Sequence, residues 1–202
     1  MSELLTFVRL GLHHITDLEA LDHILFLLAL SAIYRGRDWR EMLWVVTAFT
    51  AGHSATLALA VTDTLRLPTA LIEFLIPLTI LATGLENLFA ASRRTGVTAR
   101  GRYRPVFAGA FGLVHGAGFA NYLRSLFLGS IAVPLLGFNL GIELGQLLVL
   151  GLAGVAFGGL DRALAAVSEE RTGARVHRLR VVAVSVVVVL AAAQMALVRR
   201  PW

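Results

Sequence analysis

Residues 181–198 read VVAVSVVVVLAAAQMALV and contain no ionisable side chain. About 20 apolar residues in a helix cross the roughly 30 Å hydrocarbon core of a bilayer, and this stretch approaches that length. Backbone amides and carbonyls find no water in hydrocarbon, so a spanning segment outside a closed barrel has to be helical. The stretch therefore predicts a membrane-spanning helix. We expect it to serve packing alone, with Gln194 as its only strongly polar group.

Five further apolar runs precede this stretch in the chain. The six predicted spans are at about 18–34, 42–61, 68–91, 105–128, 131–160 and 181–198. No linker separates them into two units. We therefore expect an all-α integral membrane protein, with residues 1–202 forming a single transmembrane domain. Residues 1–12 are expected to form a short amphipathic helix on the outer surface.

The composition excludes the main soluble classes. Hydrophobic residues make up 57% of the chain and charged residues only 15%, whereas soluble domains carry roughly a quarter charged residues. The chain has no cysteine, which excludes a disulfide scaffold, thiolate metal sites and thiol catalysis. Membrane helices remain as the structure that this composition supports.

The arginines indicate how the predicted spans are oriented. All 18 basic residues are arginines, and 13 of them lie in three alternate segments, at 35–40, 93–104 and 162–180. Cytoplasmic loops of membrane proteins are enriched in basic residues. The alternation predicts that both termini lie outside, on the periplasmic side. It also accounts for the basic charge, so we expect no nucleic-acid partner.

Ionisable side chains within the spans mark the candidate functional site. Each costs about 2.5–3.5 kcal/mol on insertion scales. At a helical rise of about 1.5 Å per residue, four spans place such groups near one depth. The proposed metal ligands are Asp22, His23, His53, His115 and Glu143. Imidazole with carboxylate suits divalent Ni, Co, Zn or Fe, so the pattern predicts a metal or proton site, with interhelical hydrogen bonding as the alternative.

Polar and small residues beside these ligands have supporting roles in this interpretation. Four polar side chains share helix faces with the proposed ligands and are expected to orient them: Thr50, Ser54, Asn139 and Gln146. A stripe of glycines lies roughly opposite the Glu143 face, at 137, 141 and 145. Small residues allow helices to approach closely, either within the chain or in a homo-oligomer.

Other polar residues lie toward the ends of the spans and suggest an access or exit path. These residues are His13, His14, Asp17, Glu73 and Glu86. A cation can pass between them from the outer surface to the midplane ligands and onward. The alternative is a solvated polar surface without a transport role. Because a metal displaces protons from histidine, we expect binding to weaken as the pH falls through roughly 6.5.

Four motifs resemble those of the HupE/UreJ family, and of its second branch in particular. They are GLHHITDLEALDHILFLL at 11–28, TAFTAGHS at 47–54, FGLVHGAGF at 111–119 and FNLGIELGQ at 138–146. The resemblance implies a small bacterial inner-membrane protein. It implies a nickel or cobalt permease without its own ATPase, associated with hydrogenase and urease maturation. Residue by residue, it points to His14, Asp22, His23, His53, His115 and Glu143.

The leading hypothesis is a secondary transporter for a divalent transition metal, Ni or Co, with the lipid bilayer and the metal ion as partners. In that case the protein is not an enzyme, and the bound Ni, Co or Zn ion is its substrate. Two alternatives stay open. One is an intramembrane zinc enzyme with Glu143 or Asp22 as general base, and the other is a membrane assembly subunit that binds a metal structurally.

Overall fold

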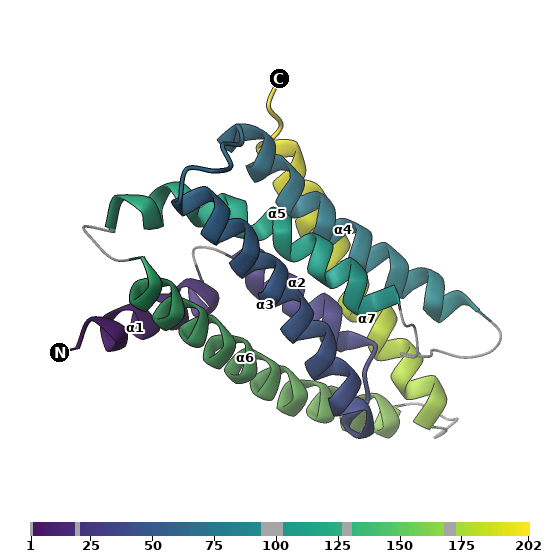
Figure 1. Ribbon diagram of the computed structural model, residues 1–202. Coiled ribbons are helices and arrows are strands. Elements are labelled where there is room, and N and C mark those ends of the chain that lie inside the picture. Colours follow the sequence, from purple (N-terminus) through teal and green to yellow (C-terminus); the bar gives the residue numbers. More distant parts are fainter. Residues whose placement is uncertain (1, 19–20, 94–102, 127–130, 168–172) are drawn as a thin grey trace.

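The computed structural model describes residues 2–18, 21–93, 103–126, 131–167 and 173–202. Figure 1 shows a bundle of helices, with the N- and C-termini well separated. The helices are α1 (Glu3–Thr16), α2 (Leu21–Ala32), a short 3₁₀ turn η1 (Gly36–Asp38), α3 (Trp39–Val61), α4 (Thr69–Ser92), α5 (Tyr103–Leu126), α6 (Ala132–Val167) and α7 (Gly173–Val198). The described part of the chain contains no strand. The prediction of an all-α protein is confirmed.

Among the described residues, four segments are long and apolar enough to cross a membrane. They are Gly36–Val61, Thr69–Ser92, Ala132–Ala166 and Gly173–Val198. Helix α2 is a shorter apolar helix. Helix α5 is not in this set, which is drawn from the described residues. The expectation of six spans with both termini outside stays a prediction.

The helix ends follow the apolar runs closely in α3 and α4. Helix α6 continues to Val167, beyond the predicted end at 160, and α7 begins at Gly173, ahead of 181. In both cases the helix extends past the apolar run into polar sequence, since a helix needs no apolar side chains once it leaves hydrocarbon. Residues 94–102, 127–128 and 168–172, which belong to predicted loops and to the end of the fourth span, lie outside the described residues.

Helix α1 does not lie alone on the surface. Its residues Phe7, Gly11 and Ile15 are buried and contact α6, beside which α1 lies in Figure 1. A Cβ on Gly11 would overlap the carbonyl oxygen of Phe138, and a Cβ on Gly141 would overlap that of Val8. The glycine stripe of α6 is therefore covered within the chain, by α1.

A second pair of helices is in similarly close contact. Helices α3 and α5 meet at three glycines, where an added Cβ would overlap a carbonyl oxygen on the opposite helix: Gly52, Gly112 and Gly116. The last of these lies against the backbone of His53. Only glycine allows this approach, so the position of His53 is fixed by backbone contact with α5.

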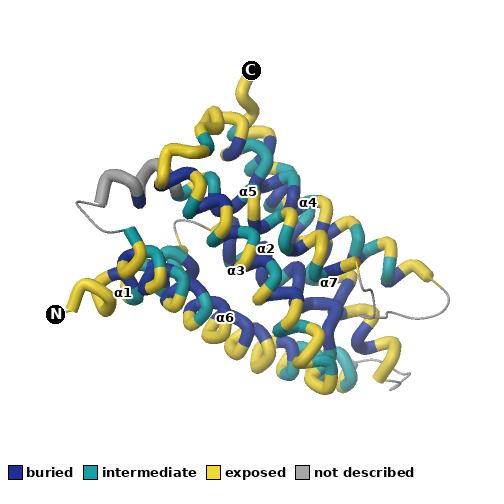
Figure 2. The backbone as a smooth tube through the Cα atoms, viewed as in Figure 1, coloured by how far each residue is buried: buried dark blue, intermediate teal, exposed yellow. Residues whose placement is uncertain are grey.

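Helices α1 and α2 follow one another along α6. Val8 and Ile15 of α1 contact Gly141 and Gly145, and Ala32 at the end of α2 packs with Phe157 further along α6. The two short helices thus run in the same direction as α6, with an interruption after Thr16. On the other side of the bundle α4 lies beside α7, and Figure 2 shows that the outer face of α6 is largely exposed, as expected for a face toward lipid.

Candidate metal site

Three imidazoles from three helices meet beside the interruption between α1 and α2. His14 comes from the last turn of α1, His23 from the first turn of α2 and His53 from the middle of α3. One nitrogen of each ring lies within 4.8 Å of one nitrogen of each other ring. Metal–nitrogen distances are about 2.0–2.1 Å, so small side-chain movements suffice for one ion to bind all three. We call these residues the three-histidine cluster.

Two of the three histidines are buried and His14 is partly buried, and each ring has at least one nitrogen without a partner in the described part of the chain. His53 is 0% exposed and His23 is 5% exposed. Both nitrogens of His53, and Nε2 of His14 and His23, have no hydrogen-bond partner among the described residues. A buried polar group left unsatisfied costs about 1–3 kcal/mol. A network of interhelical hydrogen bonds would have filled these positions, so the arrangement favours a metal ion.

The protonation of His14 fits the same interpretation. Burial lowers the pKa of the His14 imidazole well below its usual value, and the neighbouring His23 and His53 lower it further. A neutral imidazole keeps a lone pair on one nitrogen, which is the form that binds metals. His14 therefore offers a ligand atom at neutral pH without first losing a proton.

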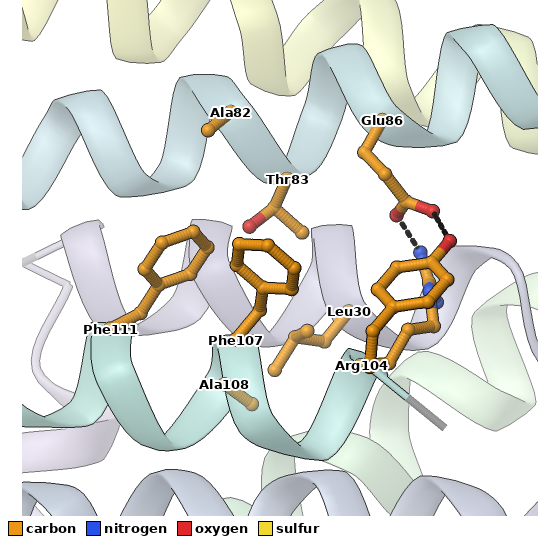
Figure 3. Close-up of a pocket in the computed structure, with 9 residues that line it drawn as sticks. Leu30, Ala82, Thr83, Glu86, Arg104, Phe107, Ala108 and Phe111 are labelled. Carbon is orange, nitrogen blue, oxygen red and sulfur yellow. Dashed lines mark hydrogen bonds and ion pairs between the residues drawn. The ribbon is translucent and has the colours of Figure 1, made fainter. Parts of the chain in front are cut away.

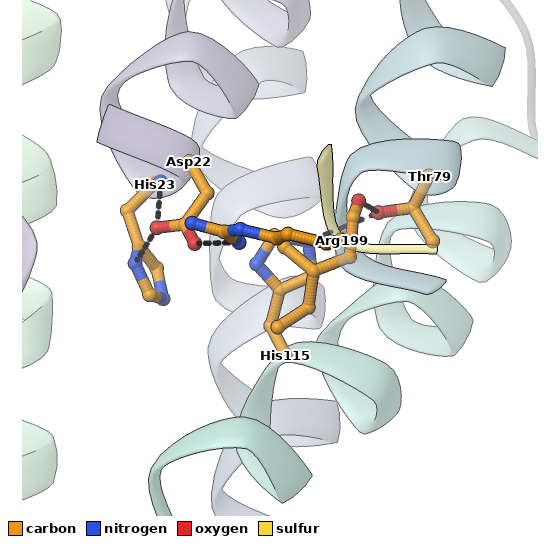
Figure 4. A network of polar contacts seen from close by, with 6 residues as sticks. Asp22, His23, Thr79, His115 and Arg199 are labelled. Atoms are coloured by element: carbon orange, nitrogen blue, oxygen red, sulfur yellow. Dashed lines mark hydrogen bonds and ion pairs between the residues drawn. The ribbon is translucent and has the colours of Figure 1, made fainter. Parts of the chain in front are cut away.

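Asp22 holds His23 in one orientation (Figure 4). Its Oδ1 accepts the backbone N–H of His23 at 2.9 Å and lies 3.1 Å from the Nδ1 of the same residue. When Nδ1 carries the proton and donates it to the carboxylate, the lone pair is on Nε2, which is the unpartnered nitrogen. The second oxygen, Oδ2, accepts from Arg199 Nη1 at 3.1 Å.

His115 lies next to the cluster without belonging to it. Its ring centre is 5.4 Å from that of His23, and its Nε2 is 3.0 Å from the Thr79 hydroxyl. Its Nδ1 is buried without a partner. His115 is thus a neighbouring donor that contacts α4 through Thr79.

Glu143 and the polar residues around it join α6 to α3. The Thr47 hydroxyl donates to Glu143 Oε1 at 3.3 Å. The four residues expected to orient the ligands pair with each other instead, Thr50 with Gln146 at 2.8 Å and Ser54 with Asn139 at 2.7 Å. The structure therefore places the Glu143 carboxylate at the α3–α6 contact and not among the imidazoles of the cluster.

The residues of the suggested path have different surroundings. His13 is exposed and pairs with Asp17 at 4.0 Å, while His14 belongs to the cluster itself. Glu73 is exposed near the start of α4. Glu86, near the other end of α4, accepts from Tyr103 at 2.8 Å and pairs with Arg104.

One polar face of α4 extends from His115 to the surroundings of Glu86. Thr79, Thr83 and Glu86 follow one another at helical spacing, from the contact with His115 to a cavity of about 140 Å³ between α2, α4 and α5. Figure 3 shows the Glu86 carboxylate at one end of this cavity, with the rings of Phe107 and Phe111 along the rest. Tyr103 and Arg104 contact that carboxylate. The cavity is otherwise apolar.

Residue types and spacing alone predicted neither His14 as a metal ligand nor Arg199 as a neighbour of the site. His14 precedes the first predicted span and was placed on the external approach to it, and only the family motif pointed to it together with the proposed ligands. Arg199 follows the last apolar run directly and counted as a topology signal. No sequence pattern shows that a residue so far along the chain reaches Asp22.

A comparison with known families matches residues 1–200 to the model described as "HupE / UreJ protein". The chain belongs to the HupE/UreJ family. The match confirms the resemblance seen in the four motifs and extends it over α7, which carries none of them. No curated protein and no solved structure showed a significant match. In this HupE/UreJ protein the three-histidine cluster thus lies within the region that defines the family.

Proposed function

We propose that this HupE/UreJ protein is a permease for a divalent transition metal, Ni or Co, and that the cation passes through the three-histidine cluster. The observation that carries the proposal is the meeting of imidazoles from three different helices, two of them buried and His14 partly buried, with ligand atoms within 4.8 Å of one another and with nitrogens that are unpartnered among the described residues. Family membership supports a metal as the transported species. A site assembled from separate helices can change its geometry when those helices move.

The chemistry of the donors sets the class of cation. Neutral imidazole binds Ni, Co, Zn and Cu, whereas Mg and Ca prefer oxygen ligands. The cluster therefore discriminates against the abundant divalent ions of the medium. His115 and Asp22 lie beside the cluster and are the further donors that we assign to the site. Glu143 takes a supporting role through the α3–α6 contact.

The proposed topology has six spans, with α2 and α5 crossing beside α3, α4, α6 and α7. The arginine asymmetry supports a location of both termini outside the cytoplasm, and the family resemblance supports a bacterial inner membrane. In this orientation α1 lies at the outer side, and the cavity at Glu86 lies toward the cytoplasm. The polar face of α4 then leads from His115 to the cytoplasmic side.

The test measures binding and flux on the same variants. Purified protein is dialysed against ⁶³Ni in detergent and, in parallel, reconstituted into vesicles for uptake. His53→Ala is expected to lose tight binding and uptake. His177→Ala is the matched control, since His177 is a histidine of similar burial on α7 that contacts the Ile33 carbonyl and lies outside the cluster.

The outcomes separate the proposal from its alternatives. Equal nickel affinity in wild type and His53→Ala contradicts the site. Binding without flux contradicts transport and supports an assembly subunit that holds a metal. Hydrolysis of added peptide or lipid by the zinc-loaded protein, lost in His53→Ala, supports the enzyme alternative instead.

A further inference from the structure

Arg199 brings a positive charge to the edge of the three-histidine cluster. It is the first residue after α7, and its backbone N–H still donates to the Met195 carbonyl at 2.9 Å. Its guanidinium reaches Asp22 Oδ2 at 3.1 Å (Figure 4). The Arg199 side chain is 30% exposed, while that of Asp22 is 11% exposed. Arg199 is thus the outer, solvent-accessible member of the pair.

This contact leaves Asp22 with no free oxygen. Oδ1 is used by the backbone and the ring of His23, and Oδ2 by Arg199. The negative charge of Asp22 is therefore balanced by Arg199. Imidazole binds a metal in its neutral form, so the ligands of the cluster supply no negative charge and the closed pair adds none. A divalent cation in a buried site needs a compensating charge, and Asp22 is the carboxylate that lies there.

We propose that Arg199 is a tethered cation that competes with the transported metal for Asp22. In the metal-free protein the guanidinium occupies the carboxylate, and an arriving divalent cation displaces it. The inference rests on the proposed function and assigns Arg199 a role in selecting the cation. The electrostatic attraction of Asp22 is greater for a divalent ion than for a monovalent ion. A divalent ion therefore displaces Arg199 from Asp22 more readily than a monovalent ion does.

The surroundings of Arg199 allow it to leave. The residue lies at a helix C-terminus, where the last carbonyls are unpaired and a positive charge is favourable. Its long side chain can therefore turn to solvent or to these carbonyls without burying a charge. The other arginines that contact the bundle interior differ, since Arg104 and Arg180 are 6% and 4% exposed and each has several partners.

The test compares two adjacent arginines. Arg199→Gln removes the competing charge and shortens no helix, and Arg200→Gln makes the same change at the neighbouring exposed position. With NiCl₂ as the probe and equilibrium dialysis in detergent as the measurement, Arg199→Gln is expected to bind nickel about 10-fold more tightly, within the usual range of coupling between two sites. Arg200→Gln and Arg199→Lys are expected to bind like wild type.

A second pair of variants identifies Asp22 as the point of competition. In an Asp22→Asn background, Arg199→Gln is expected to change nickel affinity no more than Arg200→Gln does. Weaker binding by Arg199→Gln in the wild-type background would mean that Arg199 is a strut that holds Asp22, and it overturns the proposal. An affinity equal to that of Arg200→Gln also overturns it.

Failure of the proposed function gives a different result. If wild type binds no nickel, or binds it as well as His53→Ala does, the metal site is rejected and the competition with it. If wild type binds nickel and His53→Ala does not, while Arg199→Gln and Arg200→Gln agree, only the role of Arg199 is rejected. Size-exclusion profiles and melting temperatures confirm that each variant is folded.

Discussion

The two ends of α2 carry buried polar groups in different arrangements. At its start, Nε2 of His23 has no partner and faces the other imidazoles. Past its end, Arg180 donates to the carbonyls of Ala32 and Tyr34, and His177 contacts that of Ile33 at 3.0 Å. Helix C-termini leave carbonyls without intrahelical partners, and side chains of α7 supply those partners here. Arg180 and His177 thus join α2 to α7, although His177 Nδ1 and Arg180 Nε have no partner among the described residues. What distinguishes the start of α2 is that three imidazoles with nitrogens unpartnered in the described part of the chain lie close together there.

The largest effect on stability is expected at the C-terminal end of α2, where Arg180 donates to backbone carbonyls. Arg180→Leu removes the donor to two carbonyls and leaves Asp161, which Arg180 contacts at 2.6 Å, without its partner. The loss of stability is expected to be about 3 kcal/mol, since one member of a partly buried pair stays behind. Thermal unfolding in detergent measures it, and Arg178→Leu, at an exposed position of the same helix, is the control. Nickel affinity of the folded fraction should not change, and a parallel loss of affinity would contradict the division between the two ends.

The next largest effect, on nickel affinity, is expected at the start of α2, where His23 contributes to the three-histidine cluster. His23→Ala removes one donor of the three-histidine cluster and is expected to lower nickel affinity about 100-fold, which corresponds to about 2.7 kcal/mol. Stability should hardly fall, because the variant also removes a buried nitrogen without a partner. Dialysis against nickel and thermal unfolding of the same sample test both statements. A large loss of stability with unchanged affinity would reverse the assignment.

A smaller effect is expected for the residue that orients His23. Asp22→Asn keeps the shape of the side chain but can donate to Nδ1 instead of accepting from it, which favours the wrong tautomer. Changes to groups that orient metal-bound histidines cost about 10–100-fold in affinity, and we expect about 10-fold. The ¹⁵N chemical shifts of the His23 ring report the tautomer directly. An unchanged tautomer in Asp22→Asn would contradict this role.

The smallest effect is expected at the α3–α6 contact. Glu143→Gln keeps an oxygen that accepts from Thr47, so nickel affinity is expected to fall less than about 3-fold, within the range of one neutral hydrogen bond. Glu73→Gln, at an exposed position on α4, provides the baseline. An effect as large as that of His23→Ala would show that Glu143 turns into the cluster when the metal binds.

The sequence predicted the helices better than the site, for a physical reason. Apolar runs report burial in hydrocarbon, so they locate α3 and α4 almost to the residue. Helical rise gives the depth of a side chain but not the direction in which it points. Glu143 and His53 therefore share a predicted depth, although Glu143 contacts Thr47 while His53 faces the cluster. His14 was placed on the external approach to the first span because it precedes that apolar run. The close packing of α1 on α6, which brings His14 inward, depends on a tertiary contact at Gly11.

The close glycine contacts group four of the helices into two pairs. Helices α3 and α5 touch through their backbones, and so do α1 and α6, which makes each pair a stiff unit. Between the units, α3 and α6 meet through side-chain hydrogen bonds such as Thr50 to Gln146 and Ser54 to Asn139, which can exchange partners at little cost. His14 travels with one unit and His53 with the other. Any sliding of one unit against the other therefore changes the distance between these two imidazoles, and the affinity for a bound ion changes as a result.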